Sequence, residues 1–159
     1  MTGVDDCMIC QQVDGRWPVP GGFLIEDAHW VVYHVPTPAL LVGWLVISLR
    51  RHCVDFARLT DAEARTYGLV ALRAGRAVQE VFAPERIYLC QISEIARHVH
   101  ASLVPRGRDL PPGRRSAALL AEQYALHVSG RTEGISWAEA EAGVAGLRAH
   151  LAGTPRTDH

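Results

Sequence analysis

Residues 98–104 have the composition of a β-strand, and polar and apolar residues alternate from residue 98 to residue 103, which is the pattern of a strand with two different faces. Side chains at i, i+2 and i+4 of a strand share a face, so His98, His100 and Ser102 should form one polar row. The residues between them should face a core: Val99, Ala101 and Leu103. Two imidazoles and a hydroxyl in one row are unusual as structural filler, and the pattern predicts a functional site on this strand.

The remaining hydrophobic pattern predicts further strands and one long helix. Strands are expected at 23–26, 29–34, 43–50 and 87–92, the first two as a hairpin that turns at Asp27-Ala28. Thr60 and Glu63 have the spacing of a capping box, so a helix should begin there and end near Phe82, before Pro84. Its inward stripe is expected to include Leu69, Leu72, Ala77 and Val81.

The C-terminal part of the chain predicts helices at 116–128 and 136–151, the second with Ser136 as N-cap and Glu139 at N3. Residues 154–159 should be frayed. Together the elements predict one α+β domain over residues 1–159: an antiparallel sheet with one long helix packed on it and a C-terminal helical tail. Its core is expected over 7–110 and its helical extension over 111–153.

Composition narrows the function classes. The 159 residues are 48% hydrophobic with a formal net charge of −1, so no basic surplus points to nucleic acid and no apolar run of about 20 residues points to a membrane. The N-terminus lacks the basic and apolar regions of a signal peptide, which predicts a cytoplasmic, reducing location. All sixteen basic residues are arginine, which excludes a lysine nucleophile.

Cys7 and Cys10 have the spacing at which two thiolates share one tetrahedral metal ion. Two more ligands are needed, and His52 and His98 supply them if their strands are neighbours. The resulting Cys₂His₂ site would be structural, because all four ligands come from the protein. The spacing alone is equally compatible with incidental cysteines and a histidine that merely follows a strand.

His100 suits a nucleophile that attacks phosphorus and forms a covalent phospho-histidine intermediate. Such a histidine needs one nitrogen free and the other held by an acceptor. Ser102 could donate a hydrogen bond to a phosphate oxygen, but it cannot act as an acid near neutral pH. The alternative is a histidine with a purely structural role.

The stretch His98-Val-His-Ala-Ser-Leu-Val-Pro-Arg106 resembles the signature of the histidine triad (HIT) superfamily of nucleotide hydrolases and transferases, His-φ-His-φ-His-φ-φ followed by Pro-Arg. The likeness extends over about residues 7–110 and includes the early CxxC, the strand that leads to His52 and the capped helix. It implies an α+β HIT-like fold, a homodimer, and attack by His100 on the α-phosphate of a nucleotide or nucleotide-like small molecule. Zinc-bearing members imply Zn²⁺ on Cys7, Cys10, His52 and His98.

The sequence departs from the family pattern at several positions. Ser102 replaces the third triad histidine, Trp44 replaces a histidine after Gly43, and the loop before the triad lacks glycine. Arg106, Glu94 and Trp44 are predicted to contact the substrate, the last with core packing as the alternative. These departures leave two further functions open: a nucleotide-binding or scaffold protein whose catalysis has lapsed, and a fold recruited to other chemistry in secondary metabolism.

Overall fold

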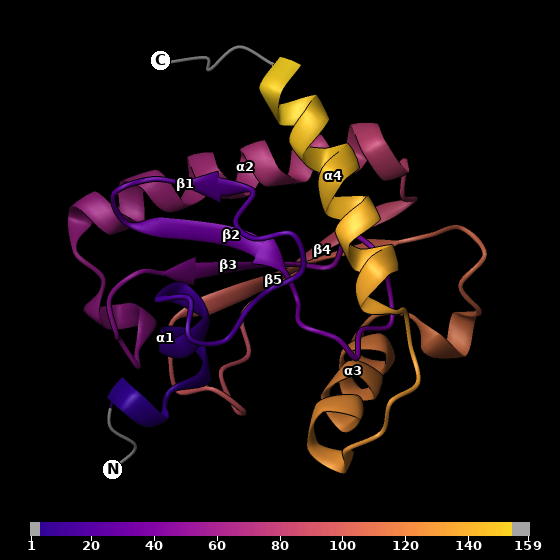
Figure 1. Ribbon diagram of the computed structural model, residues 1–159, viewed down its shortest axis with the longest axis horizontal. Helices are drawn as coiled ribbons and strands as arrows, with labels where there is room; N and C mark the ends of the chain where they lie inside the picture. Colours follow the sequence, from indigo (N-terminus) through magenta and orange to yellow (C-terminus); the bar gives the residue numbers. More distant parts are fainter. Residues whose placement is uncertain (1–3, 154–159) are drawn as a thin grey trace.

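A five-stranded antiparallel sheet forms the centre of the molecule in the computed structural model, which describes residues 4–153 (Figure 1). In spatial order its strands are β1 (Ile25–Glu26), β2 (Trp30–His34), β3 (Leu45–Leu49), β5 (His100–Arg106) and β4 (Arg86–Cys90). Every neighbouring pair is antiparallel, and β5 inserts between β3 and β4. The predicted α+β class, the hairpin and the strands are confirmed.

Alternation along the strands divides the buried residues between the two faces of the sheet. Val32, Ile47 and Leu103 pack with the long helix on one face. Tyr33 and Val46 belong to a separate cluster on the other face. Both faces are therefore covered, and β2 and β3 are buried along their whole length.

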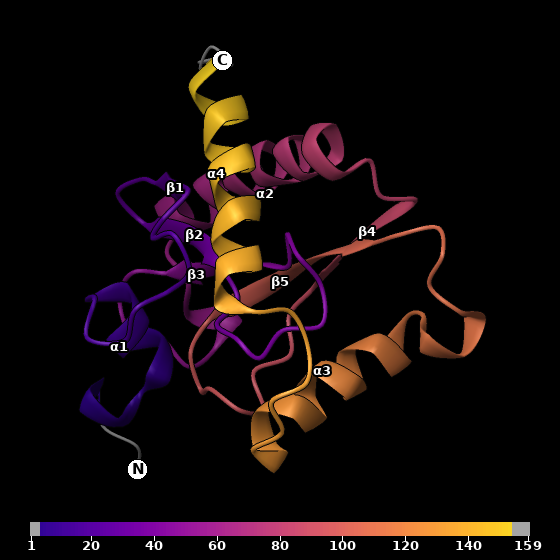
Figure 2. The same ribbon diagram turned by 45° about the vertical axis from the view of Figure 1, so that its right-hand side comes forward.

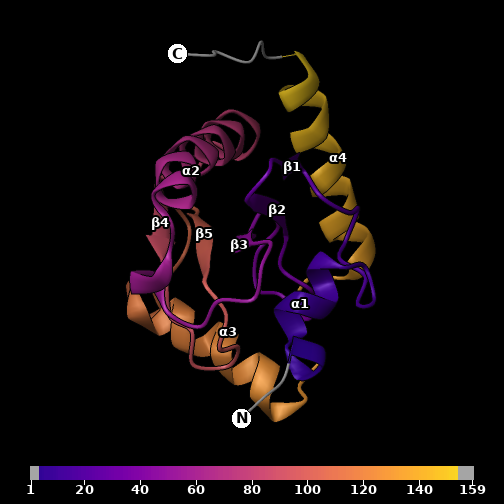
Figure 3. The ribbon, with the colours of Figure 1, turned by 90° about the vertical axis from the view of Figure 1, so that its left-hand side faces the viewer.

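The long helix α2 (Asp61–Phe82) lies along one face of the sheet (Figures 1 and 3). Its capping box is formed as predicted, because Thr60 and Glu63 hydrogen-bond each other's backbone N–H groups. The predicted inward stripe is wrong in part, since Leu69 and Leu72 are 64% and 50% exposed. Small and β-branched residues face the sheet instead and allow the helix to approach closely: Val70, Ala71, Ala74, Ala77 and Val78.

Three further helices complete the fold. Helix α4 (Trp137–Gly153) crosses α2 and contributes Leu147 to the same cluster, while α1 (Met8–Val13) and α3 (Ala117–Ser129) lie on the opposite side of the sheet (Figures 2 and 3). Short 3-10 helices cover Val4–Asp6, Phe56–Arg58 and Pro112–Arg114. Ser136 and Glu139 make the reciprocal bonds predicted for the start of the last helix. The expected fraying of 154–159 lies outside the described residues, and no helix within 4–153 has the length and apolar composition that a membrane crossing requires.

The histidine strand begins two residues later than the alternation predicts. The backbone N–H of Val99 donates to the carbonyl of Cys53, beyond β3, and the carbonyl of Val99 accepts from Leu49, the last residue of β3. Regular pairing with β3 starts only at His100, opposite Ser48. His98 therefore lies just outside the strand, at the end of the sheet where α1 begins.

Gly43 allows the chain to enter β3. Its φ of +82° is a conformation that residues with a Cβ rarely adopt, and a Cβ there would lie 2.5 Å from the ring of Phe82. Phe82 is the last residue of α2. The glycine thus permits the end of the long helix to pack directly on the start of a central strand.

Candidate functional site

Four side chains converge where α1 meets the sheet: Cys7, Cys10, His52 and His98. Their ligand atoms all lie within 4.8 Å of one another. The Nδ1 atom of His98 is 3.4 Å from the sulfur of Cys7, and the Nδ1 atom of His52 is 3.3 Å from that of Cys10. Sulfur and nitrogen ligands of one tetrahedral zinc ion stand about 3.5 Å apart. The predicted residues are therefore together, in an arrangement that can hold a metal ion.

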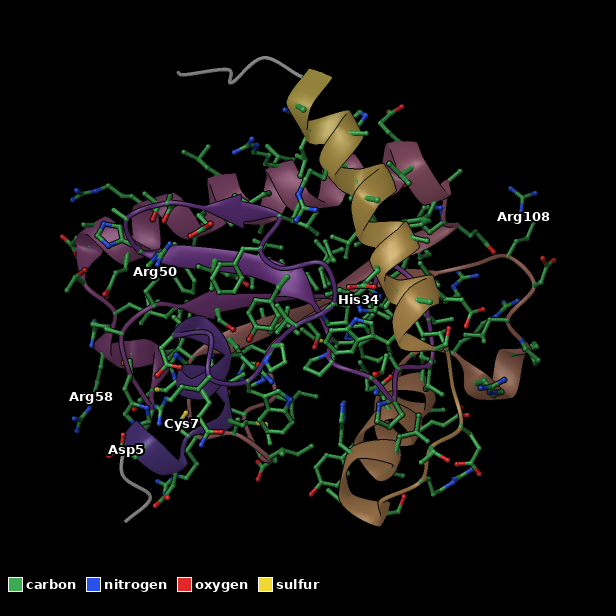
Figure 4. All side chains as sticks on the ribbon, viewed as in Figure 1. Asp5, Cys7, His34, Arg50, Arg58 and Arg108 are labelled. Atoms are coloured by element: carbon green, nitrogen blue, oxygen red, sulfur yellow. The ribbon has the colours of Figure 1, made fainter. Side chains whose placement is uncertain are left out.

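Each of these ligands is held by a different part of the fold. Cys7 caps the start of α1 and Cys10 lies one turn later, so both sulfurs face the same side (Figure 4 labels Cys7). His52 follows β3. The Nε2 atom of His98 is 2.8 Å from the carbonyl oxygen of Leu49, which fixes the hydrogen on Nε2 and leaves Nδ1 as the lone-pair nitrogen.

Burial sets the protonation of this cluster. It lowers the pKa of His98 to about 4, so the imidazole is neutral at pH 7, as a metal ligand must be. Burial also raises the pKa of Cys10 to about 12, with the Cys7 thiol beside it as a second cause. A cation bound beside Cys10 would favour its thiolate and displace that proton. The donor set fits such a cation.

A cavity of about 690 Å³ lies beside this cluster, on the face of the sheet opposite α2. Its floor includes His100 and Ser102 of β5 together with Trp44 and Val46, and α3 forms its opposite wall. Most of the lining is apolar. A volume of this size is within the range of pockets that hold small organic ligands.

His100 lies in this cavity with one ring nitrogen occupied. Its Nδ1 atom is 2.7 Å from the carbonyl oxygen of His98, and because a carbonyl only accepts, Nδ1 carries the hydrogen. The lone pair is then on Nε2. Burial lowers the pKa of His100, which keeps the ring neutral. These are the properties that a nucleophilic imidazole requires.

The other predicted site residues are distributed over three places. Ser102 and Trp44 line the cavity, and the indole N–H of Trp44 makes no hydrogen bond within residues 4–153. Arg106 does not line the cavity. It lies at the end of β5, beyond Ser102, where its guanidinium forms an ion pair with Glu85. Glu94 belongs to a separate, smaller pocket of about 190 Å³ beside Cys7.

Sequence reasoning missed two parts of the cavity. The first is Gln12 of α1, which is 4% exposed and accepts a hydrogen bond from Tyr33. The second is α3, whose Leu120, Tyr124 and His127 face the cavity although the helix reads as a tail. Gln12 follows Cys10 by two residues, so the CxxC helix offered a weak signal for it. The sequence of α3 carries no sign of which face of the sheet it covers.

No family model and no curated protein matches this sequence. Solved structures do match. A zinc-bound histidine triad family protein from Mycobacterium smegmatis superposes with a TM-score of 0.68 at 19% identity, over 94% of this chain and 96% of that one. A Hit-like protein from Bartonella henselae involved in cell-cycle regulation gives 0.69 at 11% identity, over 91% and 96%.

A third match extends the comparison to the archaea. A hypothetical histidine triad nucleotide-binding protein from Sulfolobus tokodaii strain7 gives a TM-score of 0.69 at 12% identity, over 92% of each chain. Identities this low carry information on the fold rather than on the activity. The matches extend over nearly the whole of every chain compared, including the helices after the sheet. The polypeptide therefore has the histidine triad fold.

Proposed function

We propose that the protein is a nucleotide hydrolase or nucleotidyl transferase that acts at an α-phosphate through a covalent intermediate on His100. The main support for this proposal is the hydrogen bonding of the His100 ring. Its Nδ1–H donates to the carbonyl oxygen of His98, and the lone pair of Nε2 is left in a cavity large enough for a ligand. The histidine triad fold, and the nucleotide-binding protein among the structural matches, support the substrate class.

In the first step, the Nε2 lone pair of His100 forms a bond to the α-phosphorus while the bond from phosphorus to the leaving group breaks. The leaving group takes a proton from water, since the hydroxyl of Ser102 is too weak an acid to supply one. Ser102 donates a hydrogen bond to a phosphate oxygen. In the second step, water or another acceptor attacks phosphorus and releases the nucleotide, which restores neutral His100.

The candidate leaving groups are a nucleotide polyphosphate, an amine from a phosphoramidate and a sugar phosphate. Trp44 and the apolar side chains of the cavity offer a surface for a base or another flat group. Arg106 and Glu94 stay predictions from the sequence, without a contact to this cavity.

We infer further that Cys7, Cys10, His52 and His98 bind a structural Zn²⁺. Support comes from their separations, from the lone pair of His98 directed at the sulfurs, and from the zinc-bound structure of the same fold. With four protein ligands the ion would keep no open position for chemistry. Its contribution is to fasten α1 to the end of the sheet.

A homodimer in a reducing, cytoplasmic setting completes the proposal. Leu69 and Leu72 form an exposed apolar pair on α2, and Leu89 of the edge strand β4 is 50% exposed on the face that α2 covers. Exposed apolar groups next to an unpaired strand edge favour contact with another chain. None of the four cysteines forms a disulfide, which agrees with a reducing compartment.

The test is the release of nucleoside monophosphate from adenosine and guanosine phosphoramidates, dinucleoside polyphosphates and nucleotide sugars. Wild type and His100→Ala are compared, with His29→Ala as a matched control because His29 lies in the β1–β2 turn, away from the cavity. We expect release by wild type and by the control, and a loss of more than about 1,000-fold in His100→Ala.

A trapped intermediate gives the test a second readout. Rapid acid-free quenching followed by mass spectrometry of the intact chain should show one added nucleotidyl group on wild type and none on His100→Ala. Absence of release from every substrate, by folded protein with its zinc, would refute the hydrolase and favour the nucleotide-binding or scaffold alternative. Release that persists in His100→Ala would instead point to other chemistry in the cavity.

A further inference from the structure

Gln12 is the most deeply buried polar side chain of α1, and it faces the cavity that contains His100. Its Oε1 atom accepts a hydrogen bond of 2.7 Å from the hydroxyl of Tyr33. Its amide nitrogen makes no hydrogen bond within the part of the chain that the structure describes. Since the Gln12 oxygen is occupied by the Tyr33 hydroxyl, the two N–H groups of the amide are available to a ligand in the cavity.

This bond from Tyr33 to Gln12 also fixes the direction of a second one. The Tyr33 hydroxyl lies 2.9 Å from Oγ of Ser48 as well. A phenol has one hydrogen, and it is donated to Gln12, so Ser48 must donate to Tyr33. Burial raises the pKa of Tyr33, which keeps that hydrogen in place across the physiological range. The chain Ser48–Tyr33–Gln12 therefore presents the amide with its nitrogen outward.

This chain of hydrogen bonds ends next to the proposed nucleophile. Ser48 on β3 is the direct cross-strand partner of His100 on β5. Side chains of such partners stand on the same face of a sheet, with Cβ atoms about 5 Å apart. The Gln12 amide is thus anchored, through Tyr33, to the same point of the sheet that carries His100.

Two other polar side chains around the cavity are already engaged. Gln123 uses its oxygen on the N–H of Leu40 and its nitrogen on the carbonyl of Pro38. Arg131 pairs with Glu133. No Asp or Glu side chain is among the described residues that line the cavity, so nothing there repels an anion. Gln12 is a buried and oriented donor with two unused N–H groups, alongside the unpaired indole N–H of Trp44.

We propose that the side-chain amide of Gln12 is a donor to the phosphate oxygens of the ligand, in addition to the hydroxyl of Ser102, and that Tyr33 and Ser48 hold it in position. The loop before His98 has no glycine to present backbone N–H groups to a phosphate. In this proposal a side chain of α1 supplies hydrogen-bond donors to the phosphate instead. The proposal rests on the nucleotide ligand proposed above, but not on turnover. Gln12 is a binding residue, and Tyr33 and Ser48 are positioning residues.

The test compares ligands that differ only in the phosphate: AMP with adenosine, and GMP with guanosine, measured by titration calorimetry. Gln12→Met keeps the length of the side chain and removes its donors. We expect it to weaken monophosphate binding about tenfold and to leave nucleoside binding unchanged. Tyr33→Phe, which frees the amide to rotate, should produce a smaller loss of the same kind.

Gln11→Met is the matched control, because Gln11 lies on the same helix and uses its amide on the carbonyl of Asp5, outside the cavity. It should leave both affinities unchanged, and the zinc content of all variants should equal that of wild type. Equal losses for monophosphate and nucleoside in Gln12→Met would overturn the proposal. So would unchanged monophosphate affinity, or a wild type that binds no monophosphate.

Turnover separates this inference from the proposed function. If wild type releases nucleotide, Gln12→Met should lower kcat about 10- to 100-fold while His100→Ala abolishes it. If wild type binds AMP or GMP through Gln12 and releases nothing, the proposed hydrolase fails and the phosphate site stands. If His100 chemistry is intact and Gln12→Met has wild-type kcat and affinity, only the Gln12 assignment fails.

Discussion

The Nε2 atom of His98 lies 2.8 Å from the carbonyl oxygen of Leu49, the last residue of β3. That bond directs Nδ1 toward Cys7 and Cys10, so a main-chain group of the sheet orients a proposed metal ligand. Metal binding and the packing of α1 should therefore be coupled. We expect Cys10→Ala to reduce zinc below about 0.1 equivalent per chain and to lower the free energy of unfolding by at least about 2 kcal/mol.

Metal analysis after purification without chelators, followed by urea unfolding, checks this prediction. Cys90→Ala is the control, since Cys90 is a free thiol of β4 outside the cluster. It should retain one zinc per chain. Wild-type protein with well under one zinc would contradict the assignment, as would a Cys10→Ala variant with full occupancy.

The sequence predicted the sheet and the Cys/His cluster because both depend on local patterns. Alternation placed the strands, the capping box placed α2, and the CxxC spacing limited how two sulfurs can point. The prediction that His52 and His98 lie together depended on one assumption, that the strands next to them are neighbours in the sheet. β3 and β5 are neighbours, and the cluster follows from that pairing.

The sequence could not identify the inward face of α2, because apolar side chains occur on more than one side of this helix. Leu69 and Leu72 are better core residues by hydrophobicity than Ala74, yet α2 turns its alanines to the sheet because small side chains permit close packing. Gln12 was missed for a related reason. Its role depends on Tyr33, and no local pattern reveals which polar side chains meet across the fold.

Gly43 offers a test of the junction between α2 and β3. Gly43→Ala adds a methyl group 2.5 Å from the Phe82 ring, in a backbone conformation with φ of +82°. Gly15→Ala is a matched control, since Gly15 has a φ of +80° and open space around its Cβ position. We expect the control to cost about 1 kcal/mol and Gly43→Ala to cost about 3 kcal/mol in urea unfolding. A similar loss of unfolding free energy in both variants would mean that the Phe82 ring moves aside to accommodate the methyl group.

Leu72 tests the proposed dimer. Leu72→Glu places a charge in the middle of the exposed apolar face of α2, where a partner chain would bury it. We expect sedimentation analysis to show a dimer for wild type and a monomer for the variant, with unchanged helix content. Val128→Glu alters an equally exposed residue of α3 and should leave the dimer intact. A monomeric wild type, or a variant that remains dimeric, would remove α2 from the interface.

Glu63 should make stability depend on pH at the start of α2. Hydrogen bonds from Arg51 lower the pKa of Glu63 to about 2, from 4.5 in the absence of partners. A carboxylate with a lowered folded-state pKa stabilises the protein above the unfolded value, and this contribution disappears as pH falls from about 4.5 to about 2. Gln keeps the shape and still accepts from the Thr60 N–H. Glu63→Gln should therefore lower the free energy of unfolding by about 2 kcal/mol at pH 7.

The same difference should shrink as the solution is acidified, because Glu63 of the unfolded wild-type chain becomes protonated below about pH 4.5 and folding must then remove that proton. Urea unfolding at pH 7, 4 and 3 measures it. Glu122→Gln breaks the comparable but exposed pair with Arg114, and surface pairs contribute about 0–1 kcal/mol, so this control should change stability little at any pH. A deficit in Glu63→Gln that stays constant down to pH 3 would show that the amide disturbs the helix start by its shape, and that the charge of Glu63 contributes nothing.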